Sequence, residues 1–388
     1  MVRITDKKDC SGCHACVSVC ARHSITMQED NEGFLYPKVD TNTCTDCGLC
    51  EKVCPVLNQS ESHEPLTVFA AFNSNEEIRM KSSSGGIFTL LAETILDKGG
   101  VVFGARFDKD WEVVHDYTEI KEGLAAFRGS KYVQSRIGDT FKQAEQFLKQ
   151  GRLVLYSGTP CQIAGLKKFL RKEYDNLLVI ECVCHSVPSP GIWRQYLSSF
   201  TSKRKCEVAN ICNLNFRDKI TGWEGYSVSM DFTDGTRYVS NREQDLWMKG
   251  FIGGLYTRPS CSHCPVKAKK SYADITIGDL WGNRMLLPEV EDNKGICVII
   301  VHTDIGNTIL DGLNVQVMKT FTLEEVASKN PAICYPFGRN KDSTDFYFRI
   351  QKGVDVIKVI EDMTKSPYIV KLPQLISRIV RFFIGRKS

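Results

Sequence analysis

The residues with the clearest chemistry are eight cysteines near the start of the chain. They form two sets of identical spacing, C-x2-C-x2-C-x3-C. This spacing is typical of bacterial ferredoxins that bind [4Fe–4S] clusters, where the fourth cysteine of each set ligates the other cluster. The predicted ligand sets are Cys10, Cys13, Cys16 and Cys54 for one cluster, and Cys44, Cys47, Cys50 and Cys20 for the other.

Two such clusters lie close together because each half of the segment donates a ligand to the other half. A neighbouring pair of this kind is suited to passing single electrons. Two zinc sites are the alternative, but zinc motifs usually place two C-x2-C pairs around a longer loop, which this spacing fits poorly. Pro55 follows the second set, whereas Ala21 follows the first, which removes turn rigidity but no ligand.

The composition limits the class of protein. A chain of 388 residues has room for two or three domains. A net charge of +4 with no basic run predicts no nucleic-acid partner. The first ten residues are polar and unlike a signal peptide, and no apolar run approaches the ~20 residues of a spanning helix. Because cysteines at cluster spacing belong in a reducing compartment, we expect a cytoplasmic protein.

A short hairpin is expected between the two cysteine sets, with strands at Ile25–Met27 and Phe34–Tyr36 around the turn Asn31-Glu32-Gly33. The polar segment Leu57–Pro65 follows, so we place a domain boundary near residue 62. The first domain would then hold both clusters and little else.

Strands and helices alternate over much of the remaining chain. We expect strands at Val68–Phe72, Val101–Phe103, Leu153–Tyr156, Leu177–Ile180, Ala273–Ile277 and Ile296–Val301, and helices at 87–95 and 161–170. This order predicts a largely parallel sheet covered by helices, with ligands where strands end and loops begin. Antiparallel strands are expected at Ile211–Phe216, Ser227–Phe232 and Thr236–Val239.

Several loops of this region carry residues suited to chemistry. Hydroxyls and glycines at 81–86 precede the first helix, where free N–H groups can hold a phosphate; an ordinary helix cap is the alternative. Cys161 and Cys184 follow strand ends, and Cys161 opens a helix, a position that can lower a thiol pKa and make a redox nucleophile. A further pair, Cys261-x2-Cys264, precedes a strand.

The chain resembles the coenzyme F420 hydrogenase/dehydrogenase beta-subunit family, whose relatives include a plant chlorophyll-ring reductase. The matching stretches are the dicluster segment, SSSGGIFTLLAETI, RGSKYVQS, GTPCQIAGLKKFL, CHSVPSP and CSHCPVKAKKSYADITIGDLWG. Together they cover most of residues 1 to about 300. The resemblance implies an iron–sulfur flavoprotein that carries FAD, because a flavin converts between one-electron and two-electron chemistry.

The resemblance also implies site residues. The predicted flavin-binding residues are Ser83, Ser84, Gly85, Gly86, Lys131 and Tyr132, with Lys131 near the pyrophosphate or N1; a solvated surface lysine is the alternative. Cys161, Cys184, Cys261 and Cys264 would hold a third [4Fe–4S] cluster, with a zinc site or unrelated buried cysteines as the alternatives. Cys182, Cys206, Cys212, Cys297 and Cys334 are assigned to the core.

Proton transfer needs a titratable side chain beside the flavin. His185 and Asp279 are the catalytic candidates and His263 is a third, although each such residue is more often structural. The expected fold class is α/β (α+β overall). A two-cluster ferredoxin-like domain at 1–62 precedes a mixed-sheet flavin-binding domain at 63–340, in parts 63–150 and 151–340, and a helical basic tail at 341–388.

The predicted function is electron transfer between a ferredoxin-type partner, the clusters and FAD, with hydride exchange to an organic substrate or a deazaflavin. A non-catalytic electron-transfer subunit and a redox sensor are the alternatives. After Pro373, apolar side chains and arginines fall on opposite helical faces. This helix would either dock on protein, the commoner arrangement, or rest peripherally on the inner face of an anionic membrane.

Overall fold

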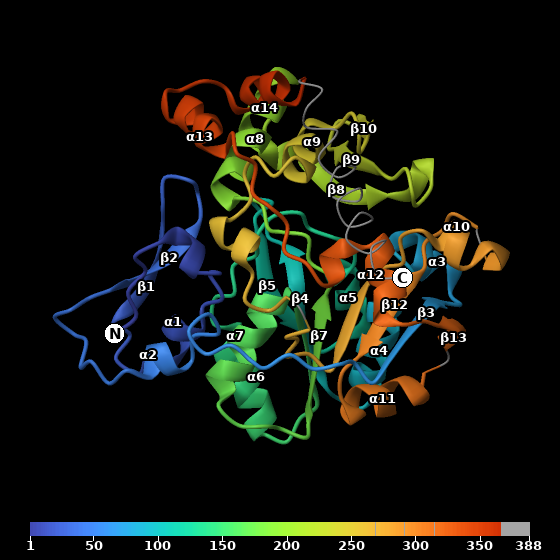
Figure 1. Cartoon of the computed structure of the whole chain (residues 1–388). Helices are drawn as coiled ribbons and strands as arrows, with labels where there is room; N and C mark the ends of the chain where they lie inside the picture. Colours follow the sequence, from blue (N-terminus) through green and yellow to red (C-terminus); the bar gives the residue numbers. More distant parts are fainter. Residues whose placement is uncertain (268, 291, 314, 366–388) are drawn as a thin grey trace, which may run out of the picture.

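A computed structural model describes residues 1–365 except 268, 291 and 314. Within those residues the largest feature is an eight-stranded sheet in the order β13-β3-β12-β11-β7-β6-β4-β5 (Figure 1). Its strands are β3 Thr67–Asn73, β4 Val101–Phe107, β5 Val113–Thr118, β6 Val154–Gly158, β7 Leu177–Cys182, β11 Ile275–Asp279, β12 Cys297–Val301 and β13 Val315–Thr320.

The sheet is mixed. Strands β4, β6, β7 and β11 run parallel to one another, whereas β5, β12, β3 and β13 pair antiparallel to their neighbours. The expectation of a largely parallel sheet is therefore right for the four adjacent strands β11, β7, β6 and β4 and wrong for the other four, whereas the expected mixed sheet is confirmed. Strand β5 turns back because the Asp108 carboxylate accepts the N–H groups of Asp110 and Glu112 and closes a tight turn after β4.

Helices cover both faces of the sheet. On one face α4 (Ile87–Asp97) buries Ile87, Leu91 and Ile95 against the strands. On the other face lie α6 (Thr140–Lys149) and α7 (Pro160–Leu170), whose apolar side chains share a core with β4, β6 and β7. The remaining short helices around this sheet are α3 Glu76–Lys81, α5 Leu124–Phe127, α10 Asn283–Leu286, α11 Asp304–Asp311 and α12 Leu323–Lys329.

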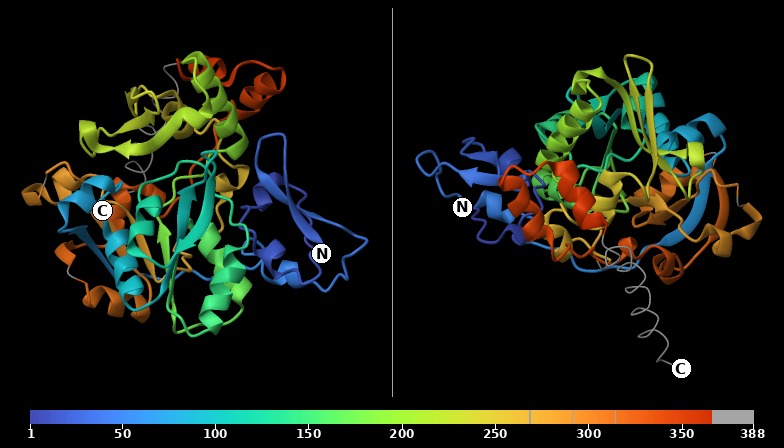
Figure 2. Two further views of the ribbon diagram at one scale, coloured as in Figure 1. Left: turned by 180° about the vertical axis from the view of Figure 1, so that it is seen from behind. Right: turned by 90° about the horizontal axis from the view of Figure 1, so that it is seen from above.

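The N-terminal segment forms a small lobe beside α7 (Figures 1 and 2). It contains the hairpin β1 (Ile25–Glu29) and β2 (Leu35–Val39) and the short helices α1 (Ala15–Val19) and α2 (Leu49–Lys52). Cys13, Ala15 and Val19 join the core that contains α7. The lobe is therefore packed on the main body through the segment that carries its first cysteine set.

A second sheet covers one end of the main body. Its strands β8 (Ile211–Asp218), β9 (Ser227–Phe232) and β10 (Arg237–Asn241) are antiparallel, as predicted. Four helices share its core, which includes the buried rings of Trp193, Trp247 and Tyr256. These helices are α8 Pro190–Lys203, α9 Leu246–Ile252, α13 Ser343–Gln351 and α14 Val356–Thr364.

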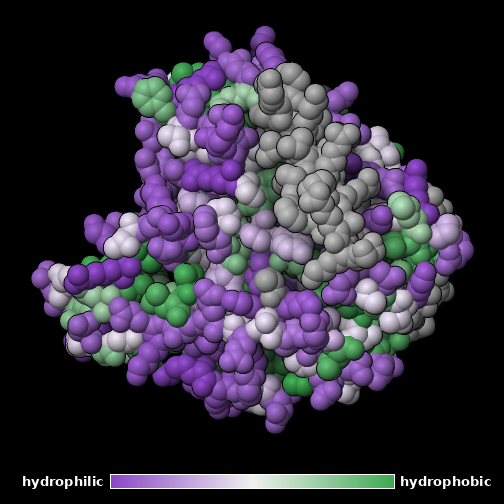
Figure 3. Space-filling model, in the orientation of Figure 1, coloured by the Kyte–Doolittle hydropathy of each residue, from purple (hydrophilic) through white to green (hydrophobic). Residues whose placement is uncertain are grey.

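The described residues test only part of the predicted membrane contact. No helix among the described residues has the length and apolar content needed to span a membrane. The face seen in Figure 3 is mostly hydrophilic, with hydrophobic residues gathered over the N-terminal lobe. The amphipathic helix predicted after Pro373 lies outside the described residues.

Candidate redox site

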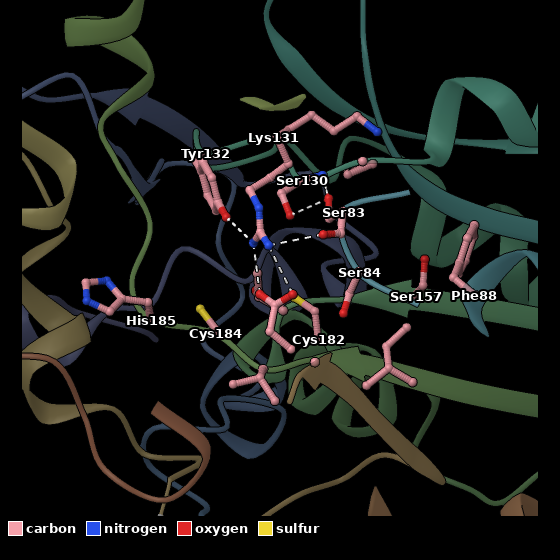
Figure 4. A pocket seen from close by; sticks show the side chains of 18 of the residues that line it. Ser83, Ser84, Phe88, Ser130, Lys131, Tyr132, Ser157, Cys182, Cys184 and His185 are labelled. Carbon is pink, nitrogen blue, oxygen red and sulfur yellow. Dashed lines mark hydrogen bonds and ion pairs between the residues drawn. The ribbon is translucent and has the colours of Figure 1, made fainter. Parts of the chain in front are cut away.

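A cavity of about 420 Å³ opens where the central parallel strands end. Its volume lies within the roughly 300–1,000 Å³ common for ligand sites. Among its lining residues are the predicted site residues Ser83, Ser84, Gly86, Lys131, Tyr132, His185 and Asp279. In Figure 4, His185 lies at one end and Phe88 and Ser157 at the other, with Ser83, Ser130 and Tyr132 between them. Residues far apart in the sequence thus surround one space.

The hydroxyl-rich loop before α4 forms one wall of the cavity. Gly86 is the N-cap of α4 in the left-handed region, at φ +81°, and the Ser83 hydroxyl accepts hydrogen bonds from the amide and hydroxyl of Ser130. Residues 86–89 at this helix start line the same space, a position that suits an anionic group. Gly85 does not line the cavity; its amide donates to Cys297 Sγ at 3.2 Å.

An ion pair crosses the centre of the site. The Arg217 guanidinium donates to Asp279 at 2.8 and 3.1 Å, to the Tyr132 hydroxyl at 3.1 Å and to the Ser83 carbonyl at 3.1 Å. Trp223 Nε1 also donates to Asp279. Because the Asp279 carboxylate is held by an arginine and an indole, its arrangement suits positioning Arg217 better than accepting a proton.

Two buried polar atoms of the cavity have no partner. Within the described residues, Arg217 Nε and His115 Nδ1 form no hydrogen bond. The other imidazole nitrogen, His115 Nε2, contacts the Ser157 carbonyl at 3.1 Å and so carries the proton. Unpartnered buried polar atoms are costly, and both residues line the cavity. Both atoms are themselves buried, so neither is exposed to the open cavity.

Lys131 is half-buried rather than a solvated surface lysine. Its ammonium donates to the carbonyls of Ala126 and Arg128 at 2.9 and 2.8 Å, which end α5. Burial lowers the pKa of Lys131 to about 7. His185 packs against Phe251 and Phe337, and burial lowers its pKa to about 4, so its imidazole is neutral near pH 7. His263 lines neither this cavity nor the next one.

A second, smaller cavity adjoins the first. Cys161, Cys184, Cys261 and Cys264 all line it, as do the cations Arg258 and Lys267. The two cavities share the wall from Cys184 to Val187. Lys267 Nζ donates to the Cys184 carbonyl at 2.8 Å. Two buried cations beside four thiols suit an anionic group, and a [4Fe–4S] cluster bound by four thiolates carries net negative charge.

Burial raises the pKa values of the four thiols that line this cavity. It raises the pKa of Cys261 to about 12 and that of Cys264 to about 11. Burial also raises the pKa of Cys161, so the lowering expected from its helix N-terminus is wrong. These thiols are protonated near pH 7 unless iron or another cation replaces the proton.

The first N-terminal cysteines lie close to this cavity. Ser11, between the first two of them, lines the cavity, and a Cβ on Gly165 of α7 would lie 2.9 Å from Cys13 Cβ. Burial raises the pKa values of Cys13 and Cys16, and Cys54 is among the groups that raise both further. Cys54 thus lies near the first set, while the ligand assignment itself stays a prediction.

Two further findings concern the cysteines. In the part of the chain that the structure describes, no three His, Cys, Asp or Glu side chains are grouped as ligands of a single metal ion. Cys297 is buried as predicted, whereas Cys182 and Cys212 are exposed and Cys206 and Cys334 are half-buried. Assigning Cys182 and Cys212 to the core is wrong. Strand β7 ends at Cys182, which lines the large cavity, and Cys212 occupies an exposed position of β8.

Comparison with known protein families shows the family to which this chain belongs. The profile for the C-terminal part of the coenzyme F420 hydrogenase/dehydrogenase beta subunit matches residues 151–327, and that for the N-terminal part of the same protein matches residues 68–142. The chain belongs to this beta-subunit family. A 4Fe-4S dicluster domain profile matches residues 9–58, so the N-terminal lobe of this family member is a dicluster domain.

Two curated relatives come from Methanosarcina mazei and Methanocaldococcus jannaschii. The F subunit of the F420H2 dehydrogenase of Methanosarcina mazei is 24% identical over 300 residues, which are 72% of this chain and 80% of that protein. The coenzyme F420-dependent sulfite reductase of Methanocaldococcus jannaschii is 27% identical over 337 residues, 83% of this chain but 48% of that protein. This beta-subunit family member therefore spans only about half of the sulfite reductase.

A solved structure is also similar. It is a chain of the F420-reducing [NiFe] hydrogenase complex from Methanosarcina barkeri, which aligns with a TM-score of 0.45 at 17% identity. The alignment covers 78% of this chain and 92% of that one.

Sequence reasoning missed several residues of the site. Arg217, His115 and Arg258 lie outside the matching stretches, and Lys267 lies inside one but is not among the predicted site residues. Each reaches a cavity only through the tertiary fold. A signal was present for Arg258, which stands three residues before the pair Cys261 and Cys264.

Proposed function

We propose that this chain is an FAD-dependent iron–sulfur oxidoreductase. It exchanges electrons with a ferredoxin-type protein and hydride with an organic substrate or a deazaflavin coenzyme. The observation that carries this proposal is the adjacency of three sites: the dicluster lobe reaches the four-cysteine cavity at Ser11, and that cavity shares the wall Cys184–Val187 with the large one. Electron carriers held in this order would form a continuous path.

FAD would occupy the large cavity. Ser83, Ser84 and the start of α4 at Gly86 would hold its phosphates, and Lys131 and Tyr132 would lie beside it. A bound flavin supplies the conversion between single electrons and hydride. Arg217, fixed by Asp279, would hold negative charge, and neutral His185 is the candidate for accepting a proton near the substrate.

The four cysteines of the small cavity would hold a third [4Fe–4S] cluster between the dicluster lobe and the flavin. Their convergence on one space supports this reading over unrelated core cysteines, and the buried cations Arg258 and Lys267 supply counter-charge. The names of two relatives contain coenzyme F420, which keeps a deazaflavin among the candidate hydride partners.

The direct test is the iron, sulfide, zinc and flavin content of anaerobically purified protein with its visible spectrum. About twelve irons and one FAD per chain would support three clusters and a flavoenzyme. About eight irons with FAD would remove the third cluster and leave the flavoenzyme.

The rival function is a subunit that only relays electrons to a partner enzyme. Eight irons with no flavin, even after reconstitution with FAD, would favour it. The large cavity, lined by Ser83, Ser84, Lys131 and Tyr132 of the predicted flavin site, supports the enzyme instead. A large change in partner binding on cluster oxidation would point to a redox sensor.

A further inference from the structure

Arg258 is a buried cation without a carboxylate partner among the described residues. Its residue is 1% exposed, and its guanidinium donates to the Cys10 carbonyl at 2.8 Å, the Leu35 carbonyl at 2.9 Å and Gln134 Oε1 at 2.9 Å. A fourth contact joins Nη2 to Cys10 Sγ at 3.8 Å. All these acceptors are formally neutral in the free protein. A buried guanidinium normally requires a compensating negative charge.

The surroundings hold Arg258 at this point. Its guanidinium carbon lies 4.3 Å from the centre of the Tyr36 ring. A Cβ on Gly12 would lie 2.8 Å from Arg258 Nη1, and Gly12 has φ +69°. A side chain at Gly12 would therefore both strain the backbone and displace the guanidinium. Residues of the lobe and of the main body thus close around one positive charge.

Two sets of cysteines flank this charge. On the lobe side, Arg258 contacts Cys10, the first cysteine of the dicluster segment. On the other side, it lines the cavity formed by Cys161, Cys184, Cys261 and Cys264. Burial raises the pKa of Cys161 and Cys261, and the charge of Arg258 acts in the opposite direction on both thiols.

We propose that Arg258 is a positioning residue that raises the reduction potentials of the two clusters on either side of it. This inference rests on the clusters of the proposed function. Reduction adds one negative charge to a cluster, and a fixed cation nearby stabilises that charge strongly in a buried, low-dielectric site. Hydrogen bonds to cluster sulfurs raise the potential in the same sense. The missing counter-charge of Arg258 is then supplied by the clusters themselves.

The other cluster of the lobe should feel this effect least, because the Coulombic effect of a charge falls with distance. Among the described residues, Arg258 makes no hydrogen bond to its predicted ligands Cys20, Cys44, Cys47 and Cys50. Electrons that enter at this outer cluster would therefore move toward clusters of higher potential nearer the flavin. Arg258 would set the direction of flow through the chain without touching the substrate.

The test is a redox titration of the full-length, anaerobically reconstituted protein, followed by EPR. In Arg258→Gln, two cluster signals should move to more negative potential and the third should move least, with unchanged iron content. Arg258→Lys should keep both potentials close to the wild-type values, because lysine keeps the positive charge. Unchanged potentials in Arg258→Gln at full iron content would overturn the inference.

A control and a second variant separate charge from structure. Arg194 also joins the lobe to the body, through Glu29 and Glu112, but it is exposed and paired, so Arg194→Gln should leave all potentials unchanged. Gln134→Glu places a carboxylate against Arg258 Nη1, at the cost of a hydrogen bond to the Ser11 carbonyl. It should lower the same two potentials with Arg258 retained, even if Arg258→Gln fails to fold.

The outcomes also distinguish this inference from the proposed function. Wild-type protein with about eight irons would refute the third cluster, and the Cys10 cluster would still report on Arg258. If no signal moves in Gln134→Glu as well as in Arg258→Gln, the inference fails while the clusters and the flavoenzyme stand.

Discussion

At the residue scale, the cysteines of the small cavity differ from the other cysteines of the main body in what surrounds them. Cys261 is half-buried next to Cys161 and Cys264, and its thiol would be protonated in the absence of metal. By contrast, Cys212 is exposed at the edge of β8, where its thiol donates to the Asp231 carbonyl. This contrast provides a matched pair for testing the third cluster.

We expect Cys261→Ser to lose about four of about twelve irons and to keep the dicluster signals, because only one cluster loses a ligand. Cys212→Ser should keep all of the iron. Iron and sulfide analysis with EPR of the reduced proteins measures both. A Cys261→Ser protein with wild-type iron content would contradict the assignment.

The lowered pKa of Lys131 leads us to expect that the affinity for flavin depends on pH. Its pKa is lowered to about 7 by burial, and a phosphate beside it would raise that pKa in the complex. Binding would then take up a proton, so affinity for FAD should fall as pH rises above about 7, by at most about tenfold per pH unit.

Lys131→Met should bind FAD weakly at every pH, and Lys131→Arg should bind it tightly with no such fall, since arginine stays charged. Fluorescence titration of flavin-free protein from about pH 6 to 9 measures this. A fall of equal size in Lys131→Met would assign the titration to another group.

At the element scale, α7 links two of the proposed clusters. Cys161 lies in its first turn, and Gly165 follows four residues later on the same face, against Cys13 of the lobe. The capping box formed by Thr159 and Gln162 fixes where the helix starts. The glycine allows the close approach of the lobe.

We expect Gly165→Ala to lower the free energy of unfolding by about 1–3 kcal/mol, because its Cβ would lie 2.9 Å from Cys13 Cβ. This loss would occur although alanine favours helix by ~1 kcal/mol. Denaturant unfolding of anaerobic protein measures it. Gly338→Ala, which meets no atom within 4 Å, is the control. A more stable Gly165→Ala protein would show that the lobe does not pack there.

At the scale of the whole molecule, the proposed point of electron entry is the lobe. Its hairpin tip rests on the start of α8, where the Ser189 hydroxyl donates to the Glu32 carbonyl at 2.6 Å and Gly191 packs against Gly33. Cys47, a predicted ligand of the outer cluster, is exposed, whereas Cys13 of the inner set is buried. An external donor would therefore meet the outer cluster first.

We expect Cys47→Ser to abolish the fast phase of flavin reduction by reduced ferredoxin, because the entry cluster is lost. Photoreduction of the bound flavin, which bypasses the clusters, should be unchanged. Stopped-flow absorbance measures the first and steady-state spectra the second. An unchanged fast phase would place electron entry elsewhere.

The sequence by itself determined the local features of this protein. Cysteine spacing specifies the dicluster lobe because its ligands are close in the chain. Short apolar runs and helical patterns place most strands of the large sheet together with α4 and α7. Only the tertiary structure decided which distant residues meet. Arg217 reaches Asp279 and Tyr132, and Arg258 reaches Cys10, across more than 60 residues, because packing of the lobe and sheets fixes those contacts. No local pattern encodes such long-range packing, and for that reason the two arginines of the site were not foreseen.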